Sequence, residues 1–245
     1  MRCSNAEIVQ VAPGPAIAPL DERAGAVLID LDGTILDTAG EIAEAVNRML
    51  ADYCAAPLPL PQIRGFIGRG VPHLMGEVLR VADGKVDVSH SEALARFEVH
   101  YAATNGTCAR VYPGVIAGLE GLRADGWKLG CVTNKPNRFV EPLLERLGLR
   151  KYFGCVVCGD SLLEMKPSPL PLLHACSALG ADPAQSIMVG DSLHDVEAAR
   201  AAGMRLYVVP YGYSGKLGVT ALPPERLIAA LDQLPALLGT QFDPS

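Results

Sequence analysis

Two different patterns of hydrophobic and polar positions divide this chain. In the first, between about residues 40 and 110, apolar side chains such as Ile42, Val46 and Met49 recur at the spacing of one helical face. The helices that this spacing predicts cover residues 41–53, 71–82 and 89–104, with a proline-rich break at 57–61 after the first. No convincing strand falls inside this region, so the sequence predicts an all-helical block.

In the second pattern, short apolar runs alternate with amphipathic helices. The predicted strands are 26–31, 127–132, 155–158, 186–190 and 205–209. The predicted helices of this region are 115–125, 138–147, 169–179, 194–202 and 224–238. Alternation of this kind is typical of right-handed βαβ units, so it implies a parallel sheet.

The helical block interrupts the α/β pattern after its first strand. We therefore expect an inserted cap at 40–110, with residues 24–39 and 111–245 forming the α/β core. The fold class that follows is α/β, a Rossmann-like doubly wound parallel sheet core with an inserted all-helical cap domain. Residues 1–23 are mildly apolar but contain three prolines, which favours an N-terminal tail over a signal peptide.

The composition argues against several classes of protein. The 245 residues include 21 Lys and Arg against 27 Asp and Glu, a net charge of −6. With no basic stripe, the chain is not expected to bind nucleic acid. No apolar run approaches the length of a membrane span. Seven cysteines, an odd number in a chain this long, suggest reduced thiols in a cytoplasmic protein rather than a disulfide framework.

One cysteine pair, Cys155 and Cys158, has the C-x-x-C spacing that also occurs in metal and redox sites. If this segment is a strand, residues three apart point to opposite faces, so the two sulfurs cannot bind one metal ion. We expect the pair to be two small buried apolar residues.

Polar residues stand at the ends of three predicted strands. Asp30 and Asp32 end the first strand, Thr133 follows the strand at 127–132, and Asp191 follows the strand at 186–190. In a parallel sheet the ligand site lies beyond the carboxyl ends of the strands. The sequence therefore predicts that these side chains converge on one site.

The aspartates of this set are hard oxygen ligands of the kind that Mg²⁺ prefers. Asp30 and Asp32 face the same way in an extended segment, and two like charges so close need a cation or a shared proton. Each aspartate also has a simpler explanation, because D-x-D pairs are common in surface loops and Asp191 or Asp195 can stabilise a helix start. Those roles do not exclude metal binding. The sequence contains no set of His and Cys residues with the spacing of a zinc site that would offer another place for a metal ion.

A second group of residues offers ligands for phosphate. Thr133 and Asn134 end a strand before Pro136, where a hydroxyl and free backbone N–H groups can hold phosphate oxygens. Lys166, before Pro167, can neutralise phosphate and the crowded carboxylates. A lone lysine is more often a solvated surface charge, but its position between the second and third motif strands favours the functional interpretation.

Together these residues resemble the four motifs of the haloacid dehalogenase superfamily in its phosphatase form. The matching segments are Asp30-x-Asp32-Gly-Thr-x-x-Asp37-Thr38, Val132-Thr133-Asn134, Lys166-Pro-x-Pro169 and Gly190-Asp191-Ser-x-x-Asp195, in the superfamily's order. The resemblance covers about 24–240, and it implies that the helical block is a type I cap. The chain is also similar to bacterial phosphoglycolate phosphatases, through the less specific segments 63–71, 112–115, 195–203 and 211–213.

The resemblance implies a phosphoric monoester hydrolase that converts 2-phosphoglycolate to glycolate and phosphate. Asp30 is then the nucleophile that forms an aspartyl-phosphate, and Asp32 protonates the leaving oxygen and later activates water. The implied cofactor is Mg²⁺, held by Asp30, the backbone carbonyl of Asp32 and Asp191. Asp195 is expected to orient the metal shell or Lys166.

The resemblance also assigns residues to the two ends of the substrate. Thr133, the Asn134 backbone and Lys166 are expected to bind the phosphate oxygens. A small anionic leaving group such as glycolate would need a cation from the cap, for which Arg64 and Arg69 are the candidates. Either arginine is explained equally well as a solvated helix residue.

Other substrates and reactions stay open. The alternatives are a phosphatase for pyrophosphate or a sugar phosphate, a β-phosphoglucomutase-type isomerase, and a binding protein that has lost catalysis. Thr34 stands where the mutases usually have Val, which disfavours isomerisation, and the intact set of motif residues disfavours the binding protein. The expected partner is a small phosphorylated metabolite, without nucleic acid or membrane, and a homodimer is possible.

Overall fold

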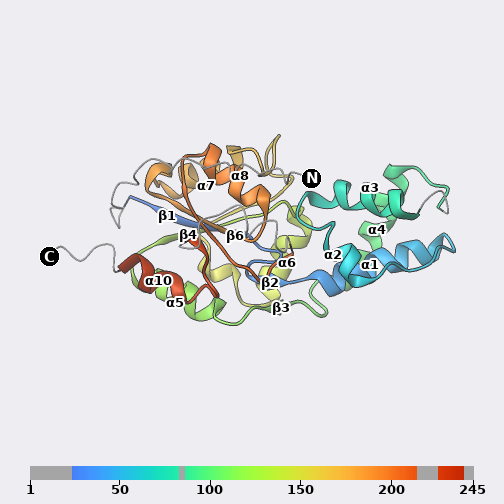
Figure 1. Cartoon of the computed structure of the whole chain (residues 1–245), viewed down its shortest axis with the longest axis horizontal. Coiled ribbons are helices and arrows are strands. Elements are labelled where there is room, and N and C mark those ends of the chain that lie inside the picture. The colour runs from blue at the N-terminus through green and yellow to red at the C-terminus, as the bar shows by residue number, and fades with distance from the viewer. Residues whose placement is uncertain (1–23, 83–85, 214–225, 240–245) are drawn as a thin grey trace, which may run out of the picture.

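A parallel five-stranded sheet forms the centre of the computed structural model, which describes residues 24–82, 86–213 and 226–239. The strands are β1 (Ala26–Ile29), β4 (Lys128–Val132), β5 (Cys155–Val157), β6 (Ile187–Gly190) and β7 (Arg205–Val208). Their order is β5-β4-β1-β6-β7, so the chain builds outward on one side of β1 and then crosses to the other (Figure 1). The α/β class with a doubly wound sheet is thereby confirmed. The predicted tail, 1–23, lies outside the described residues.

Helices cover both faces of the sheet. On one face lie α7 (Leu170–Leu179) and α8 (Leu193–Ala201), and on the other lie α5 (Val115–Ala124), α6 (Asn137–Arg146) and α10 (Gln233–Gly239) (Figure 1). Successive strand residues point to opposite faces, so Val27 and Ile29 pack toward α5 while Leu28 packs toward α7. Burial on both faces explains why the strands appear in the sequence as continuous apolar runs.

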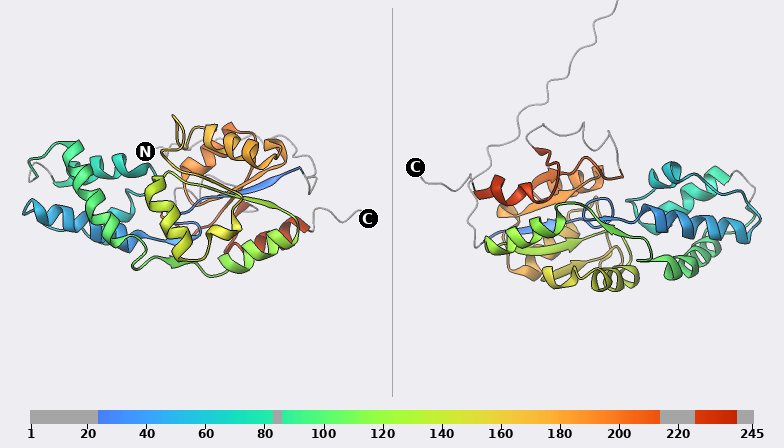
Figure 2. Two further views of the ribbon diagram at one scale, coloured as in Figure 1. Left: turned by 180° about the vertical axis from the view of Figure 1, so that it is seen from behind. Right: turned by 90° about the horizontal axis from the view of Figure 1, so that it is seen from below.

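Four helices form a separate group beyond the carboxyl end of β1, here called the helical block. They are α1 (Ala39–Asp52), α2 (Leu60–Arg64), α3 (Gly70–Ala82) and α4 (His90–Thr104), and Figures 1 and 2 show them to one side of the sheet. Their apolar faces enclose a cluster in which Met49, Met75 and Phe97 are fully buried. Within the described ranges, no helix is long and apolar enough to cross a membrane.

A short antiparallel pair joins the helical block to the core. It consists of β2 (Leu36–Asp37) and β3 (Arg110–Val111), where the chain leaves the core and returns to it. Glu41, fully buried at the start of α1, accepts backbone N–H groups of Gly106 at 2.8 Å and Ala109 at 3.1 Å. The two crossings are thus held side by side, and this fixes the position of α1 close to the strand ends.

The helix α2 is absent from the sequence-based prediction. It begins inside the proline-rich segment 57–61, which the pattern marks as a break. Pro59 is its N-cap residue and Pro61 lies in its first turn. The first helical N–H groups have no partner within the helix, so the missing proline donor costs little there.

The predicted helix 224–238 is wrong over residues 226–232, because α10 begins only at Gln233, and residues 224 and 225 lie outside the described residues. Leu227 bridges to Val208 instead, and the Ile228 N–H donates to the Val208 carbonyl at 3.0 Å. Pro235 explains the late start, since proline is tolerated in the first turn of a helix but not in its interior.

The C-x-x-C pair does not form a buried unit. Cys158 is buried just beyond β5, whereas Cys155, in β5, is only half-buried, so the expectation that both are buried is wrong for Cys155. Both are free thiols, as are the other four cysteines of the described part of the chain.

Candidate active site

The carboxyl ends of β4, β1 and β6 lie next to one another in the sheet. Thr133, Asp30 and Asp191 follow these strands directly and are 4%, 7% and 3% exposed. β1 pairs in register with both neighbours, so the three residues emerge side by side at the point where the strand order reverses. This is where open α/β sheets bind their ligands.

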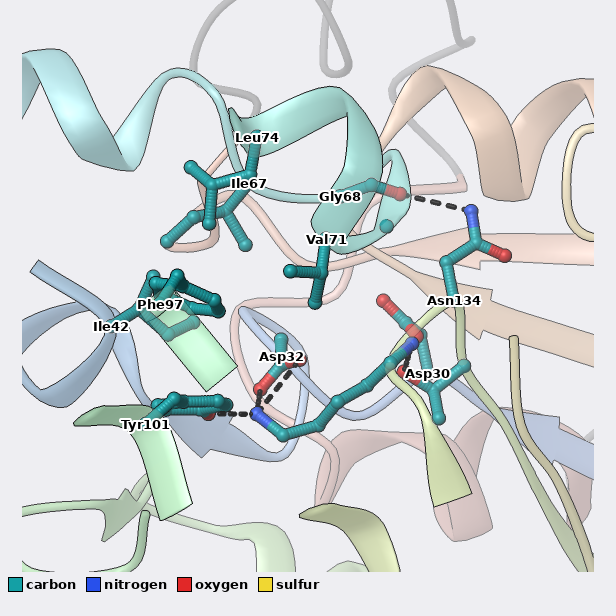
Figure 3. Close-up of a pocket in the computed structure, with 13 residues that line it drawn as sticks. Asp30, Asp32, Ile42, Ile67, Gly68, Val71, Leu74, Phe97, Tyr101 and Asn134 are labelled. Carbon is teal, nitrogen blue, oxygen red and sulfur yellow. Dashed lines mark hydrogen bonds and ion pairs between the residues drawn. The ribbon is translucent and has the colours of Figure 1, made fainter. Parts of the chain in front are cut away.

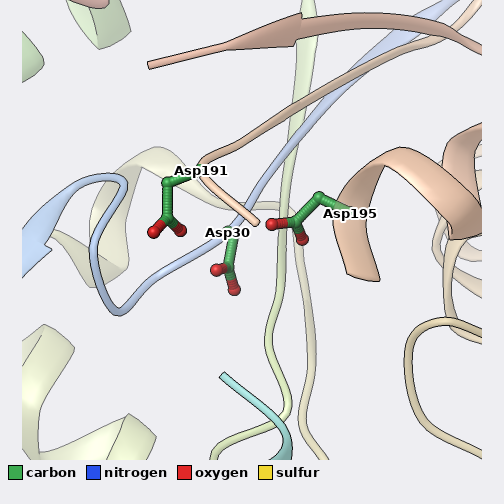
Figure 4. Close-up of side chains that lie close together, drawn as sticks. All are labelled: Asp30, Asp191 and Asp195. Atoms are coloured by element: carbon green, nitrogen blue, oxygen red, sulfur yellow. The ribbon is translucent and has the colours of Figure 1, made fainter. Parts of the chain in front are cut away.

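Three carboxyl groups gather at this edge. Ligand atoms of Asp30, Asp191 and Asp195 lie within 4.8 Å of one another, and Figure 4 shows the three side chains close together. Burial, together with the charge of Asp195, raises the pKa of Asp30 to about 8 and that of Asp191 to about 7, against the lowering effect of Lys166. Buried like charges that repel in this way fit an oxygen-ligated divalent cation.

The backbone leaves room for the Asp191 carboxylate in only one place. A Cβ atom on Gly33 would lie 2.6 Å from Asp191 Oδ2, and one on Gly212 would lie 2.2 Å from it. The Tyr213 N–H donates to Oδ2 at 2.6 Å, and the Thr34 hydroxyl donates to Oδ1 at 3.2 Å. Two close backbone approaches and two hydrogen bonds therefore fix this side chain.

We expect Gly212→Ala to disturb this arrangement without unfolding the protein. The new methyl group would displace Asp191, and a shift of about 1 Å in a reacting group can lower turnover about 100-fold. The matched control is Gly239→Ala at the end of α10, where an added Cβ meets nothing within 4 Å. Phosphate release and thermal unfolding of both variants are the measurements. A Gly212→Ala enzyme with normal turnover would show that Asp191 need not occupy this position.

Lys166 is the counter-charge of the carboxyl cluster. It is 3% exposed, and its Nζ donates to Asp30 Oδ1 at 2.8 Å, Asp195 Oδ1 at 2.7 Å and the Val132 carbonyl at 2.7 Å. Although burial lowers its pKa, the charges of Asp195 and Asp30 raise it more, so the amine stays protonated. Through these three contacts the ammonium group links the ends of β1 and β4 to Asp195.

Asp195 has a structural function as well as its contact with Lys166. It forms a capping box with Ser192 at the start of α8, in which its Oδ2 accepts the Ser192 N–H at 3.0 Å and the Ser192 hydroxyl at 2.6 Å. One oxygen is thereby fixed by the helix and the other by Lys166. The side chain is fully buried, so α8 holds it rigidly at the cluster.

Asp32 lies apart from the three clustered carboxyl groups. Its Oδ1 accepts the Thr38 hydroxyl at 2.6 Å, and Lys135 Nζ lies 3.0 Å from Oδ1 and 3.3 Å from Oδ2. Asp30 and Asp32 both line one pocket between the strand ends and the helical block (Figure 3). The two carboxylates thus face one ligand space but have different partners, since Asp30 contacts Lys166 instead.

The pocket joins the core to the helical block. The core contributes Asp30, Asp32, Thr133, Asn134 and Lys135, and the block contributes Ile42, Ile67, Gly68, Gly70, Val71, Leu74, Phe97 and Tyr101. The Asn134 side chain spans the boundary, because its Nδ2 donates to the Gly68 carbonyl at 3.0 Å (Figure 3) and to the Lys166 carbonyl at 2.9 Å. The loop before α3 therefore closes directly over the strand ends.

The two cap arginines lie away from the pocket wall. Arg64 donates to the backbone carbonyls of Tyr211 at 3.0 Å and Gly212 at 3.2 Å, and its guanidinium lies 5.0 Å from the Tyr213 ring centroid. Arg69 is exposed. Neither is among the described residues that line the pocket. Arg64 instead fastens the helical block to the segment that holds Asp191.

Two residues at the pocket, Lys135 and Tyr101, are not predicted from the sequence. Lys135 is 5% exposed and bonds both Asp32 and the Tyr101 hydroxyl, which in turn lies 3.4 Å from Glu41. Lys135 could have been suspected, because it follows Thr133 and Asn134 directly at a strand end. Tyr101 gives no such signal, since it is one of several apolar residues on the inner face of α4.

Comparisons with known proteins agree with this geometry. The model of the haloacid dehalogenase-like hydrolases matches residues 24–203. A plasmid-encoded phosphoglycolate phosphatase of Cupriavidus necator is 52% identical over 213 residues, which are 87% of this chain and 92% of the relative. The phosphoglycolate phosphatase of Nitrosospira multiformis is 44% identical over 218 residues, which cover 87% of this chain and 95% of the relative. The crystal structure of a predicted phosphoglycolate phosphatase from Haemophilus somnus has a TM-score of 0.80 at 28% identity, covering 88% of this chain and 98% of that chain.

Proposed function

This chain belongs to the haloacid dehalogenase-like hydrolases and is a phosphatase, and from that premise we propose that it hydrolyses 2-phosphoglycolate with Mg²⁺ through an aspartyl-phosphate. The observation that carries the proposal is the position of Asp30, which stands at a strand end, contacts Lys166 at 2.8 Å and faces the same pocket as Asp32. The names of relatives that are 52% and 44% identical support the choice of substrate.

In the first chemical step, a carboxylate oxygen of Asp30 attacks phosphorus, and the bond from phosphorus to the leaving oxygen breaks. Asp32 donates a proton to that oxygen, so glycolate departs as an alcohol. In the second step, Asp32 accepts a proton from water, the water oxygen attacks phosphorus, and the bond to Asp30 breaks to release phosphate. The pair of carboxylates suits this division, because they face one pocket and have different counter-ions, Lys166 and Lys135.

The carboxyl cluster gives the proposed cofactor its ligands. Asp30, Asp191 and the backbone carbonyl of Asp32 would hold Mg²⁺, which would offset charge on the transferring phosphoryl group. Asp195 supports the site through Lys166, whose Nζ it contacts at 2.7 Å.

The phosphate oxygens are assigned to Thr133, the Asn134 backbone and Lys166. The Thr133 hydroxyl accepts the Lys135 N–H at 3.2 Å and still carries its own proton to donate.

The helical block, with boundaries near 40 and 110, is proposed to act as a cap that excludes water from the pocket. The reduced cysteines agree with a cytoplasmic location.

A screen of phosphate release over small phosphate esters tests the substrate. In the presence of Mg²⁺, kcat/KM for 2-phosphoglycolate is expected to exceed the values for sugar phosphates and pyrophosphate by at least about 100-fold, as expected for a site that bonds a specific polar group. Analysis of the sugar phosphate products separates hydrolysis from isomerisation. An ester that is turned over much faster than 2-phosphoglycolate would refute the proposed substrate and leave the phosphatase class intact.

A further inference from the structure

The helical block presents an almost entirely apolar wall to the pocket. Its lining side chains include Ile42, Ile67, Val71, Leu74 and Phe97 (Figure 3). Arg64 is committed to the backbone of 211–212, and Arg69 is exposed. An anionic leaving group therefore finds no cationic side chain on the cap side among the described residues that line the pocket.

The core, and not the cap, supplies the cationic side chain that lines the pocket. Lys135 is the single cationic residue among the described residues that line the pocket, and it is 5% exposed. Its Nζ lies between Asp32, at 3.0 Å from Oδ1, and Tyr101, whose ring centroid is 4.8 Å away and whose hydroxyl it also contacts. Because Tyr101 belongs to α4 and Asp32 follows β1, the amine stands at the boundary between cap and core.

We propose that Lys135 is the specificity-determining residue for the leaving group, and that it selects esters whose leaving group bears a carboxylate. The inference rests on the proposed function, in which Asp32 protonates the leaving oxygen and must lie within hydrogen-bond reach of it. In 2-phosphoglycolate a single methylene separates that oxygen from the carboxylate. The amine beside Asp32 is thus within reach of the carboxylate, whereas Arg64 and Arg69 are not on the pocket wall.

The charges around the pocket make the contact between Lys135 and the substrate carboxylate necessary for binding. Asp30 and Asp32 both face the pocket, and the remaining lining is largely apolar, so a third carboxylate would be repelled unless a cation met it. A protonated lysine can bond two carboxylates at once, because its ammonium has three donors. The hydroxyl of Tyr101 accepts a further hydrogen bond from the same amine.

The test compares two phosphate esters that differ only in whether the leaving group bears a carboxylate. Wild-type enzyme and Lys135→Met are assayed with Mg²⁺ on 2-phosphoglycolate and on 2-hydroxyethyl phosphate, in which a hydroxymethyl group replaces the carboxylate. Removing one partner of a buried charge pair is expected to lower the ratio of the two kcat/KM values by about 30-fold or more. The ratio is independent of the fraction of folded enzyme, so partial misfolding of the variant does not affect it.

Arg69→Met is the matched control, because it removes a cation from the cap that does not line the pocket. It is expected to keep the wild-type ratio. If Lys135→Met lowers both kcat/KM values equally, Lys135 acts only through Asp32, and the inference is overturned while 2-phosphoglycolate remains the substrate. If the wild-type enzyme shows no preference for the carboxylate ester, the inference is overturned together with the proposed substrate.

Discussion

Asp30→Asn is expected to abolish turnover, with kcat lower by at least about four orders of magnitude, as for the loss of other enzymic nucleophiles. The amide of asparagine is too weak a nucleophile to form the phospho-enzyme. The fold should survive, because the carboxyl group of Asp30 is buried among Asp191 and Asp195, and its charge is unfavourable there. Removing a buried negative charge relieves that repulsion, even though the contact with Lys166 becomes weaker.

Rapid acid quenching after mixing with substrate and Mg²⁺ measures the intermediate directly. Wild-type protein is expected to retain phosphate on Asp30, and Asp30→Asn to retain none. Asp125→Asn is the matched control, because Asp125 is an exposed residue at the end of α5. It should behave as wild type in quench, turnover and thermal unfolding. An Asp30→Asn protein that keeps more than about one per cent of turnover, or that still carries phosphate, would exclude Asp30 as nucleophile.

The strand ends could be predicted from the sequence because their signals are local. A buried strand gives a short apolar run, and the polar residue that follows it, such as Asp30, Thr133 or Asp191, marks the carboxyl edge. The order of the sheet strands then places these residues together, although they are as much as 161 positions apart. No knowledge of side-chain packing is needed for this step.

The cap side of the pocket could not be predicted in the same way. Which residue of α4 reaches Lys135 depends on how the helical block docks on the core, and a helical pattern gives the inner face but not its partner. Arg64 illustrates the difficulty, because its charge suggests a substrate contact, yet it bonds the carbonyls of Tyr211 and Gly212. Those acceptors are backbone atoms almost 150 residues away, and no side-chain pattern marks them.

Removal of divalent cations is expected to stop turnover completely and to lower the melting temperature by several degrees. A ligand at about 100 times its Kd stabilises the folded state by about 2.7 kcal/mol, which is several degrees for a chain of this size. Chelator-treated and Mg²⁺-supplemented protein, compared by thermal unfolding and phosphate release, give both quantities. Turnover that persists in excess chelator would exclude a divalent cation from the reaction.

The stabilisation by Mg²⁺ should increase with pH, because protons and metal compete for the same carboxyl groups. Without metal, the pKa values of Asp30 and Asp191 are raised by burial to about 8 and about 7, from an ordinary value of 3.8. Between about pH 4 and pH 8, these two carboxyl groups hold protons in the folded protein that they have lost in the unfolded chain. The stabilisation that this proton binding gives to the folded state is therefore lost as the pH rises from about 4 to 8. Mg²⁺ replaces those protons, and the difference in melting temperature with and without Mg²⁺ is therefore expected to be larger at pH 8 than at pH 5.5. Asp191→Asn should abolish most of this pH dependence, and a difference that is equal at both pH values in wild-type protein would show that Asp30 and Asp191 do not bind the ion.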